Sequence, residues 1–291
     1  MPERASELGV SIGEVLQQAA ARLERCGVGN GRREARSLWA AVAGVAPGAV
    51  WLQRDDAAPA AVASHFRTAV ARRSSGVPFA YAVGRASFRG LDLQLDSRAL
   101  IPRPETEGLV ELALQAAREA GAGGAAADVG TGSGCIALSL AVEGAFDRVV
   151  AVERSPDAAA LARTNIALVR PRTPVEVREG DLLAPLRDGA RYRVIVANPP
   201  YLTPAEYAAL DPAVRRFEPR EALVSGGDGL QATRALLEGA GPLVAPRGVL
   251  ALEIDERRAD AVRGLAVACG WGRAEIRDDL FGRPRYALAW L

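Results

Sequence analysis

The chain has 291 residues, of which 49% are hydrophobic and 24% are charged, and its formal net charge is +1. This length exceeds what one small core needs, so we expect one large domain and one smaller domain in an ordinary globular protein. The near-zero net charge argues against a protein that coats nucleic acid or an anionic membrane. No apolar run approaches the ~20 residues of a membrane span, and residues 1–24 lack the apolar centre of a signal peptide. We therefore expect a cytoplasmic protein without membrane association.

Residues 1–80 are predicted to form a small helical domain. The stretch SIGEVLQQAAARLERCG has apolar residues at helical spacing, with Ser11 as the expected N-cap and Gly27 at its end. The single histidine, His65, falls in another of these helices, so we expect neither an imidazole base nor a metal site. Within residues 81–100 the stretch FRGLDLQLD alternates apolar and polar residues, which predicts a β-hairpin connector.

From residue 101 to residue 291, predicted strands and helices alternate. The strands are expected in AAADVG, RVVAVE, VEVREGD, YRVIVAN, GVLALEI, AEIRDDL and RYALAWL, and helical patterns lie between most of them. This alternation predicts an α/β domain with a doubly wound, mostly parallel, seven-stranded sheet covered by helices on both faces. In such sheets ligands bind at the carboxyl ends of the strands. Four successive strands end here in polar or glycine-rich residues.

The first of these strands runs into DVGTGSG. Gly130, Gly132 and Gly134 allow a sharp turn and a close approach of the backbone to a ligand. The helix that follows offers free N–H groups at its start. The glycine spacing is GxGxG, not the GxGxxG of dinucleotide-binding proteins, and a plain turn between strand and helix is the structural alternative.

The second strand is expected to end at Glu153 and the third at Asp181, just before Leu182. A carboxylate at the end of the second strand can accept hydrogen bonds from both hydroxyls of a ribose. An acidic side chain next to an apolar one suits the amino group and the face of an adenine. The structural alternatives are a solvated strand end and a turn-forming Asp after Gly180.

The fourth strand runs into the residues Asn198, Pro199, Pro200 and Tyr201. Proline has no N–H, so this turn presents backbone carbonyls with few donors beside them, and Asn198 adds a side-chain carbonyl. A planar NH2 group has two hydrogens to donate and is the natural guest, while Tyr201 offers a flat face for stacking. The structural alternative is a Pro-Pro turn capped by Asn. The pattern favours a pocket for an amide or an aromatic amine.

The combination of DVGTGSG, Glu153, Asp181 and NPPY resembles the class I S-adenosylmethionine-dependent methyltransferases that act on planar nitrogens. These include adenine-N6 DNA methyltransferases and the glutamine methyltransferases of peptide chain release factors. LIPRPETEGLVE before the glycine loop, RFEPREAL and GGDGL after NPPY, and the closing DDLFGRPRYALA look like the release-factor enzymes, the PrmC/HemK family. The resemblance covers nearly the whole chain, although residues 1–75 match only in length and helical character.

The resemblance implies a methyltransferase domain in residues 101–291 that uses S-adenosyl-L-methionine and releases S-adenosyl-L-homocysteine. It implies that the partner is a class I release factor, which presents the Gln of its Gly-Gly-Gln (GGQ) motif to the catalytic domain. Residues 1–80 are then expected to be a second substrate-recognition surface, and no direct nucleic acid binding is expected. The implied cofactor-binding residues are Asp128, Gly130, Thr131, Gly132, Ser133 and Gly134 for the methionine part, Glu153 for the ribose, Asp181 and Leu182 for the adenine, and Asn198. The implied substrate-binding residues are Asn198, Pro199, Pro200 and Tyr201, of which Asn198, Pro199 and Tyr201 are expected to be catalytic. The chain departs from many relatives at Glu153, where Asp is common, and at Leu182, where an aromatic residue can occur.

Two other functions remain open at this point. NPPY fits the amine of adenine as well as an amide, so an adenine-N6 methyltransferase on DNA or RNA is the first alternative, and arginine pairs such as Arg72 and Arg73 keep it open. The near-zero net charge and the lack of an evident basic recognition segment argue against it. The second alternative is a non-catalytic binding module, against which the intact glycines, Glu153 and NPPY all count.

Overall fold

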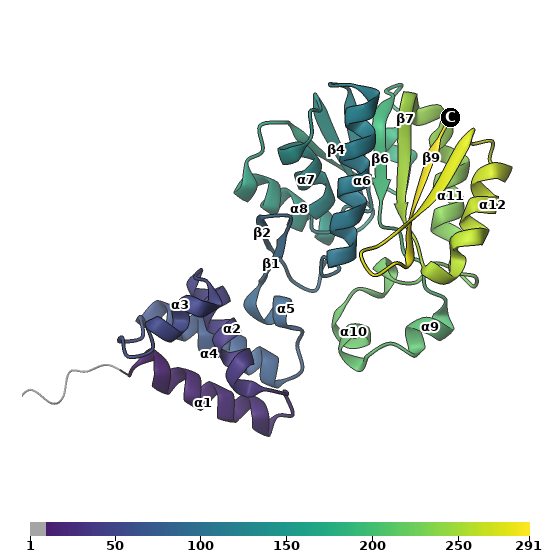
Figure 1. Cartoon of the computed structure of the whole chain (residues 1–291). Helices are drawn as coiled ribbons and strands as arrows, with labels where there is room; N and C mark the ends of the chain where they lie inside the picture. The colour runs from purple at the N-terminus through teal and green to yellow at the C-terminus, as the bar shows by residue number, and fades with distance from the viewer. Residues whose placement is uncertain (1–9) are drawn as a thin grey trace, which may run out of the picture. The chain divides into compact units, whose positions relative to one another are not determined.

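The computed structural model describes residues 10–291, and Figure 1 shows the path of the chain. The chain divides into two compact units, of which the first ends at Arg85 and the second spans Ala86–Leu291. Across residues 10–291, every helix is too short or too polar to span a lipid bilayer.

The described part of the first unit is helical. Its helices are α1 (Ile12–Arg25), α2 (Gly31–Ala43), α3 (Pro47–Leu52), α4 (Ala60–Ser74) and α5 (Phe79–Val83). As predicted, Ser11 caps α1, because its hydroxyl accepts from the backbone N–H of Glu14 and the Glu14 carboxylate accepts from the backbone N–H of Ser11. Trp39 of α2 and Phe66 of α4 are buried edge to face, with ring centroids 5.1 Å apart. His65 lies exposed on α4.

A β-hairpin follows the helical unit. Strand β1 (Arg85–Phe88) and strand β2 (Leu91–Gln94) are joined by Arg89 and Gly90 alone, and both residues have positive φ, 45° and 77°. Positive φ at both positions is the requirement of the two-residue turn whose twist matches that of the strands. The Arg89 side chain reaches Glu111 at 2.8 Å and Glu143 at 2.6 Å. These ion pairs attach the hairpin to the helices that carry the two glutamates.

The second unit contains a seven-stranded sheet, which confirms the predicted fold class. The strands are β3 (Ala125–Val129), β4 (Arg148–Glu153), β5 (Val175–Glu179), β6 (Tyr192–Ala197), β7 (Val244–Glu253), β8 (Arg273–Asp278) and β9 (Pro284–Trp290). Their order across the sheet is β5-β4-β3-β6-β7-β9-β8. The first five in this order are parallel, and β9 runs antiparallel to both of its neighbours.

Helices cover both faces of this sheet, as Figure 1 shows. One face carries α6 (Pro104–Ala120), α7 (Cys135–Glu143) and α8 (Pro156–Val169), and the other carries α11 (Gln231–Ala240) and α12 (Ala259–Ala268). Alternate strand residues point to opposite faces, so Val149 packs with the first group and Val150 with the second. Because both faces are covered, the central strands are continuous apolar runs, and every residue of β3 is buried.

The topology determines where a ligand can bind. The chain runs outward from β3 through β4 to β5 and then returns to the other side of β3 with β6, so the direction reverses between β3 and β6. Such a reversal leaves a crevice at the carboxyl ends of the two strands. Val129, at the end of β3, is in register with Val152 of β4 and with Ala197 of β6. The residues that follow these three, Gly130, Glu153 and Asn198, therefore meet at one edge of the sheet.

Candidate active site

A cavity of about 710 Å³ lies at this carboxyl edge, within the size range of small-molecule sites. The predicted site residues that line it are Gly130, Thr131, Gly132, Ser133, Glu153, Asp181, Leu182, Asn198, Pro199 and Pro200. Asp128, Gly134 and Tyr201 are not among the lining residues and lie behind or beside its wall. The structure thus brings residues from four strand ends into one cavity.

The glycine loop after β3 turns sharply back over the strand. Gly130, Gly132 and Gly134 have φ values of 78°, 55° and 83°, a region that residues with a Cβ rarely occupy. The backbone N–H groups of Gly130 and Thr131 both donate to the carbonyl of Val152, at 2.9 Å each. The loop is therefore tied to the end of β4, and its backbone forms one wall of the cavity.

Asp128 supports this loop from beneath. Its side chain is fully buried, and Oδ2 accepts from the Thr131 hydroxyl at 2.5 Å and from the Ala137 N–H at 3.0 Å. Burial raises the pKa of Asp128 to about 7, although the hydrogen bonds from Thr131 and Ala137 lower this pKa. Because it holds both the loop and the first turn of α7, Asp128 shapes the wall rather than facing the cavity.

Glu153 lies at the rim of the cavity with its carboxylate held by the backbone. Oε2 accepts from the N–H of Gly132 at 2.8 Å, and Oε1 accepts from the N–H of Ser155 at 2.9 Å. An ionised carboxylate has about four lone-pair sites, so both oxygens keep capacity for hydroxyl donors from a ligand. The two backbone bonds fix the direction in which the carboxylate points.

Asp181 and Leu182, which follow β5, also line the cavity. The Asp181 side chain is 67% exposed, and its nearest cation is Arg154, with 3.9 Å between Nη1 and Oδ1. Leu182 has a φ of 45°, an unusual value for a residue with a Cβ. This left-handed conformation lies in the turn after Gly180, directly at the cavity wall.

The NPPY turn after β6 forms another part of the cavity wall. Asn198, Pro199 and Pro200 line the cavity, and Asn198 Nδ2 donates to the hydroxyl of Thr106 at 3.1 Å. Tyr201 is mostly buried, its hydroxyl lies 3.4 Å from Oε1 of Glu253, and burial raises its pKa. The predicted stacking by Tyr201 stays a prediction, since this ring does not line the cavity.

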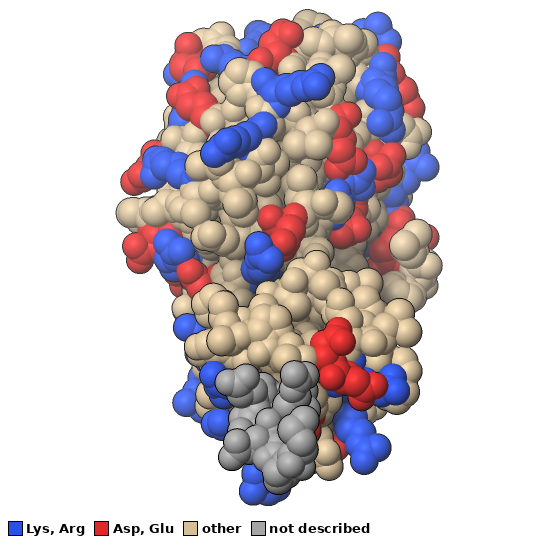
Figure 2. All heavy atoms as spheres, turned by 90° about the vertical axis from the view of Figure 1, so that its left-hand side faces the viewer, with Lys and Arg blue, Asp and Glu red and all other residues tan. Residues whose placement is uncertain are grey.

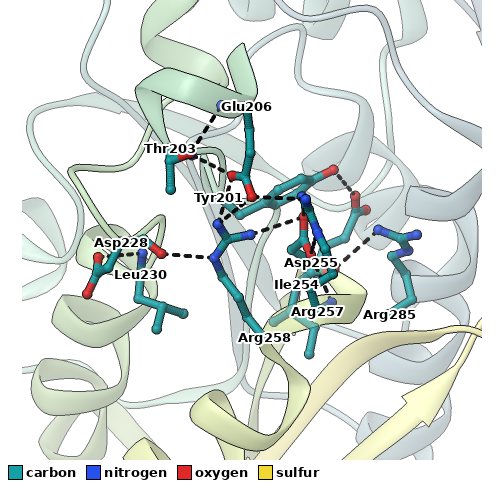
Figure 3. Close-up of polar contacts among 11 residues, drawn as sticks. Tyr201, Thr203, Glu206, Asp228, Leu230, Ile254, Asp255, Arg257, Arg258 and Arg285 are labelled. Carbon is teal, nitrogen blue, oxygen red and sulfur yellow. Dashed lines mark hydrogen bonds and ion pairs between the residues drawn. The ribbon is translucent and has the colours of Figure 1, made fainter. Parts of the chain in front are cut away.

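Arg258 holds the segment that follows the NPPY turn, as Figure 3 shows. Its Nη2 binds Glu206 at 2.7 Å, its Nε donates to the carbonyl of Asp228 at 2.9 Å, and its Nη1 lies 3.2 Å from Asp255. Glu206 belongs to α9 (Pro204–Ala208), three residues beyond the NPPY turn. One mostly buried guanidinium therefore connects three segments around the turn and stiffens it.

Sequence reasoning missed two buried carboxylates, Glu218 and Glu253, that lie beside the cavity without lining it. Glu218 is buried and accepts from Arg103 at 2.6 Å and from the N–H of Ile101 at 3.2 Å. These contacts join LIPRPETEGLVE (residues 100–111) to RFEPREAL (residues 216–223), and both stretches contribute residues to the cavity lining. Glu253 was missed as well, although the sequence carries a signal for it. It ends the fifth parallel strand, β7, just as Glu153 ends β4.

The fold and the glycine loop define the class, a methyltransferase of the class I fold. Solved structures agree on the fold: a methyltransferase from Pyrococcus furiosus superposes with a TM-score of 0.51 at 20% identity, over 70% of this chain and 89% of that chain. The methyltransferase domain of METTL16 gives a TM-score of 0.54 at 16% identity, over 87% of this chain and 91% of that chain. A family model described as the methyltransferase small domain matches residues 108–232.

The particular family follows from closer relatives. The PrmC N-terminal domain model matches residues 14–84. The chain is 41% identical to the release factor glutamine methyltransferase of Moorella thermoacetica, over 97% of this chain and 99% of the relative. It is 38% identical to that of Cereibacter sphaeroides (96% and 98%) and 38% identical to that of Deinococcus radiodurans (96% and 98%). The chain belongs to the release factor glutamine methyltransferase family.

Proposed function

We propose that this chain transfers a methyl group from S-adenosyl-L-methionine to the side-chain amide nitrogen of the Gln in the GGQ motif of class I peptide chain release factors. The observation that carries the proposal is the acceptor-rich wall of Asn198, Pro199 and Pro200, with few donors, in the same cavity as the glycine loop. This partner places the reaction in the cytoplasm, where release factors act on ribosomes. The names of the relatives support a release factor as the substrate.

The residues of the cavity fit S-adenosyl-L-methionine. The glycine loop leaves room for a ligand, since a Cβ built on Gly130 would meet nothing within 4 Å. The fixed carboxylate of Glu153 suits the two ribose hydroxyls, and Asp181 with Leu182 suits the amino group and the face of the adenine. Oδ1 of Asp128 has no hydrogen-bond partner in the part of the chain that the structure describes, which leaves a buried acceptor behind the loop. When bound, this cofactor supplies an electrophilic methyl group on a sulfonium.

Asn198 and Pro199 prepare the nitrogen of the substrate. An amide nitrogen is a weak nucleophile because its lone pair is delocalised into the carbonyl. We assign the two N–H groups of the substrate amide to Oδ1 of Asn198 and the backbone carbonyl of Pro199. These acceptors draw the hydrogens to one side, keep electron density on nitrogen and orient its lone pair. The amide proton becomes acidic only as the nitrogen is alkylated, so water suffices to remove it.

The first test is mass spectrometry of a release factor incubated with the protein and S-adenosyl-L-methionine. One added methyl on the Gln of GGQ is the expected result, and a release factor with Gln→Ala at that position is the matched control. Asn198→Ala is expected to lower turnover at saturating S-adenosyl-L-methionine about 10²-fold, the usual effect of removing one positioned polar group. Full methyl transfer by this variant would refute the role assigned to Asn198.

Residues 1–80 are proposed to grip the release factor outside its GGQ loop. Two large apolar side chains, Trp51 and Leu52 at the end of α3, are 60% and 80% exposed. Exposed apolar side chains that lie together are typical of protein-binding surfaces. This unit matches the PrmC N-terminal domain, the part of the chain that distinguishes it from single-domain methyltransferases.

The adenine-N6 alternative is not favoured. Four relatives that are 37–41% identical over most of the chain are release factor glutamine methyltransferases by name. On the face drawn in Figure 2, Arg and acidic side chains are interspersed and do not separate by sign. Nucleic acid binding depends on a coherent positive surface, so this pattern offers a phosphate backbone little attraction.

A further inference from the structure

A chain of hydrogen bonds leads from the NPPY turn into the interior of the second unit. Asn198 Nδ2 donates to Oγ1 of Thr106 at 3.1 Å, and the Thr106 hydroxyl donates to Oε2 of Glu253 at 2.7 Å. Thr106 and Glu253 are buried, with exposed fractions of 2% and 1%. They come from α6 and β7, so two elements other than β6 hold the side chain of Asn198.

The direction of each bond in this chain follows from the chemistry of its groups. An ionised carboxylate can only accept hydrogen bonds, and a threonine hydroxyl has a single hydrogen to donate. Glu253 therefore takes the hydrogen of Thr106, and Oγ1 of Thr106 is left as an acceptor. The amide atom of Asn198 that faces Thr106 must then be its NH2 group. This assignment stands independently of the ambiguity between the oxygen and nitrogen of an asparagine amide.

We propose that Thr106 and Glu253 are positioning residues that lock the amide of Asn198 with its carbonyl oxygen, not its NH2 group, toward the substrate. The inference rests on the proposed function and deepens it. Among residues 10–291 no group donates to Oδ1 of Asn198, and Asn198 lines the cavity. The oxygen is thus free to accept a hydrogen from the amide nitrogen that becomes methylated.

The opposite orientation would disable the site. If the amide of Asn198 were turned by 180°, its NH2 group would face the NH2 group of the substrate, and two donors would oppose each other. The wall would then lose the property on which its selectivity depends, an excess of acceptors over donors. A turn built only from prolines and one rotatable amide needs an external lock, and Thr106 is placed to provide it.

Glu253 has features that a purely structural residue does not require. Within residues 10–291 it is buried without an ion pair of its own. The nearby Arg285 pairs instead with Asp279, at 3.6 Å between Nε and Oδ2, and its Nη1 donates to the carbonyl of Ile254 at 3.4 Å, the second contact being drawn in Figure 3. Burying a carboxylate in this manner is costly, and a residue of similar size without a charge would fill the space. The carboxylate contacts both ends of the NPPY turn, Asn198 through Thr106 and the Tyr201 hydroxyl directly at 3.4 Å.

The surroundings of Glu253 make the lock sensitive to pH. Glu105 of α6, Tyr201 of the NPPY turn, and Arg285 and Tyr286 of β9 face it. Burial raises the pKa of Glu253 to about 6, against the opposing influence of its hydrogen bonds and of Arg285. Once protonated, Glu253 can donate a hydrogen bond to the hydroxyl of Thr106. The hydrogen of that hydroxyl is then no longer held by the carboxylate. That hydroxyl can then donate to Asn198, so the lock loosens as the pH falls.

The decisive experiment compares three proteins on a GGQ-containing release factor: the wild type, Thr106→Val and Thr106→Ser. Valine has the shape of threonine without the hydroxyl, whereas serine keeps the hydroxyl. We expect Thr106→Val to lower kcat about 10–100-fold, the effect of leaving a buried polar group unpaired. We expect its dissociation constant for S-adenosyl-L-methionine to stay unchanged and Thr106→Ser to restore most of the lost turnover. Wild-type kcat in Thr106→Val would overturn the proposal.

The pH profile of kcat supplies a second readout that needs no core substitution. We expect turnover of the wild type to fall on the acid side with an apparent pKa near 6 and the acid limb to be absent in Glu253→Gln, which is slow at every pH. If Thr106→Val unfolds, the pH profile of the wild type tests the proposal instead. A wild-type kcat that does not change between about pH 5 and 8 overturns the proposal. Failure of the wild type to methylate any release factor would refute the proposed function instead.

Discussion

Replacing Glu153 by alanine should weaken cofactor binding because its carboxylate organises the glycine loop. The bonds that it accepts from Gly132 at 2.8 Å and from Ser155 at 2.9 Å fix the carboxylate for the two ribose hydroxyls, and hydrogen bonds from these hydroxyls to a charged group are worth about 1.5–3 kcal/mol each. The carboxylate is only partly buried, so water can replace part of this in the variant. A net loss of about 3 kcal/mol corresponds to a roughly 10²-fold higher dissociation constant for S-adenosyl-L-methionine.

Isothermal titration calorimetry with S-adenosyl-L-methionine and with S-adenosyl-L-homocysteine measures this change. Glu179→Ala is the matched control, because Glu179 also ends a parallel strand at the same edge of the sheet but does not line the cavity. Its ion pair with Arg163 is about half exposed on both sides and is worth only about 0–1 kcal/mol. A dissociation constant for Glu153→Ala within about threefold of the wild-type value would refute the reasoning, since 3 kcal/mol demands far more.

Three further predictions concern stability and partner binding. The folded-state pKa of Asp128, about 7, lies above its unfolded value, so its contribution to stability is present at acidic pH and is lost as the pH rises through 7. Asparagine cannot titrate, so urea unfolding should show that Asp128→Asn loses less stability than the wild type between about pH 5 and 8. Gly108→Ala should lower the free energy of unfolding by about 1–3 kcal/mol, because the new Cβ would overlap the Tyr286 hydroxyl, whereas Gly264→Ala in the open surface of α12 should be neutral or stabilising. Trp51→Ser should raise KM for a whole release factor but not for a short GGQ peptide, and an equal change for both would argue against recognition by the first unit.

The mechanism of the site combines a stiff wall with adjustable side chains. The Pro-Pro turn cannot rotate out of place, and Arg258 holds the segment beyond it through Glu206 and Asp255. Only the amide of Asn198 has rotational freedom among the proposed acceptors. Because the site depends on the orientation of the Asn198 amide, the buried contact that orients this amide, the one with Thr106, matters for turnover.

Much of this architecture is visible in the sequence because the features concerned are local. Alternating apolar runs and helical patterns predict the parallel sheet, and the end of each strand is marked by the residue type that follows it. The glycine loop, Glu153 and the NPPY turn each lie directly after an apolar strand. Since parallel strands all present their carboxyl ends at one edge, these separate signals predict one shared site.

The lock on Asn198 and the pairing of Arg103 with Glu218 could be decided only by the tertiary structure. Thr106 is 92 residues from Asn198 and 147 from Glu253 along the chain, and Arg103 is 115 residues from Glu218. No periodicity links positions so far apart, because their contact depends on strand order, on register and on the way α6 packs across the sheet. The residues around the reacting nitrogen can be named from local pattern, but the orientation of the amide that meets it is set by neighbours that only folding brings together.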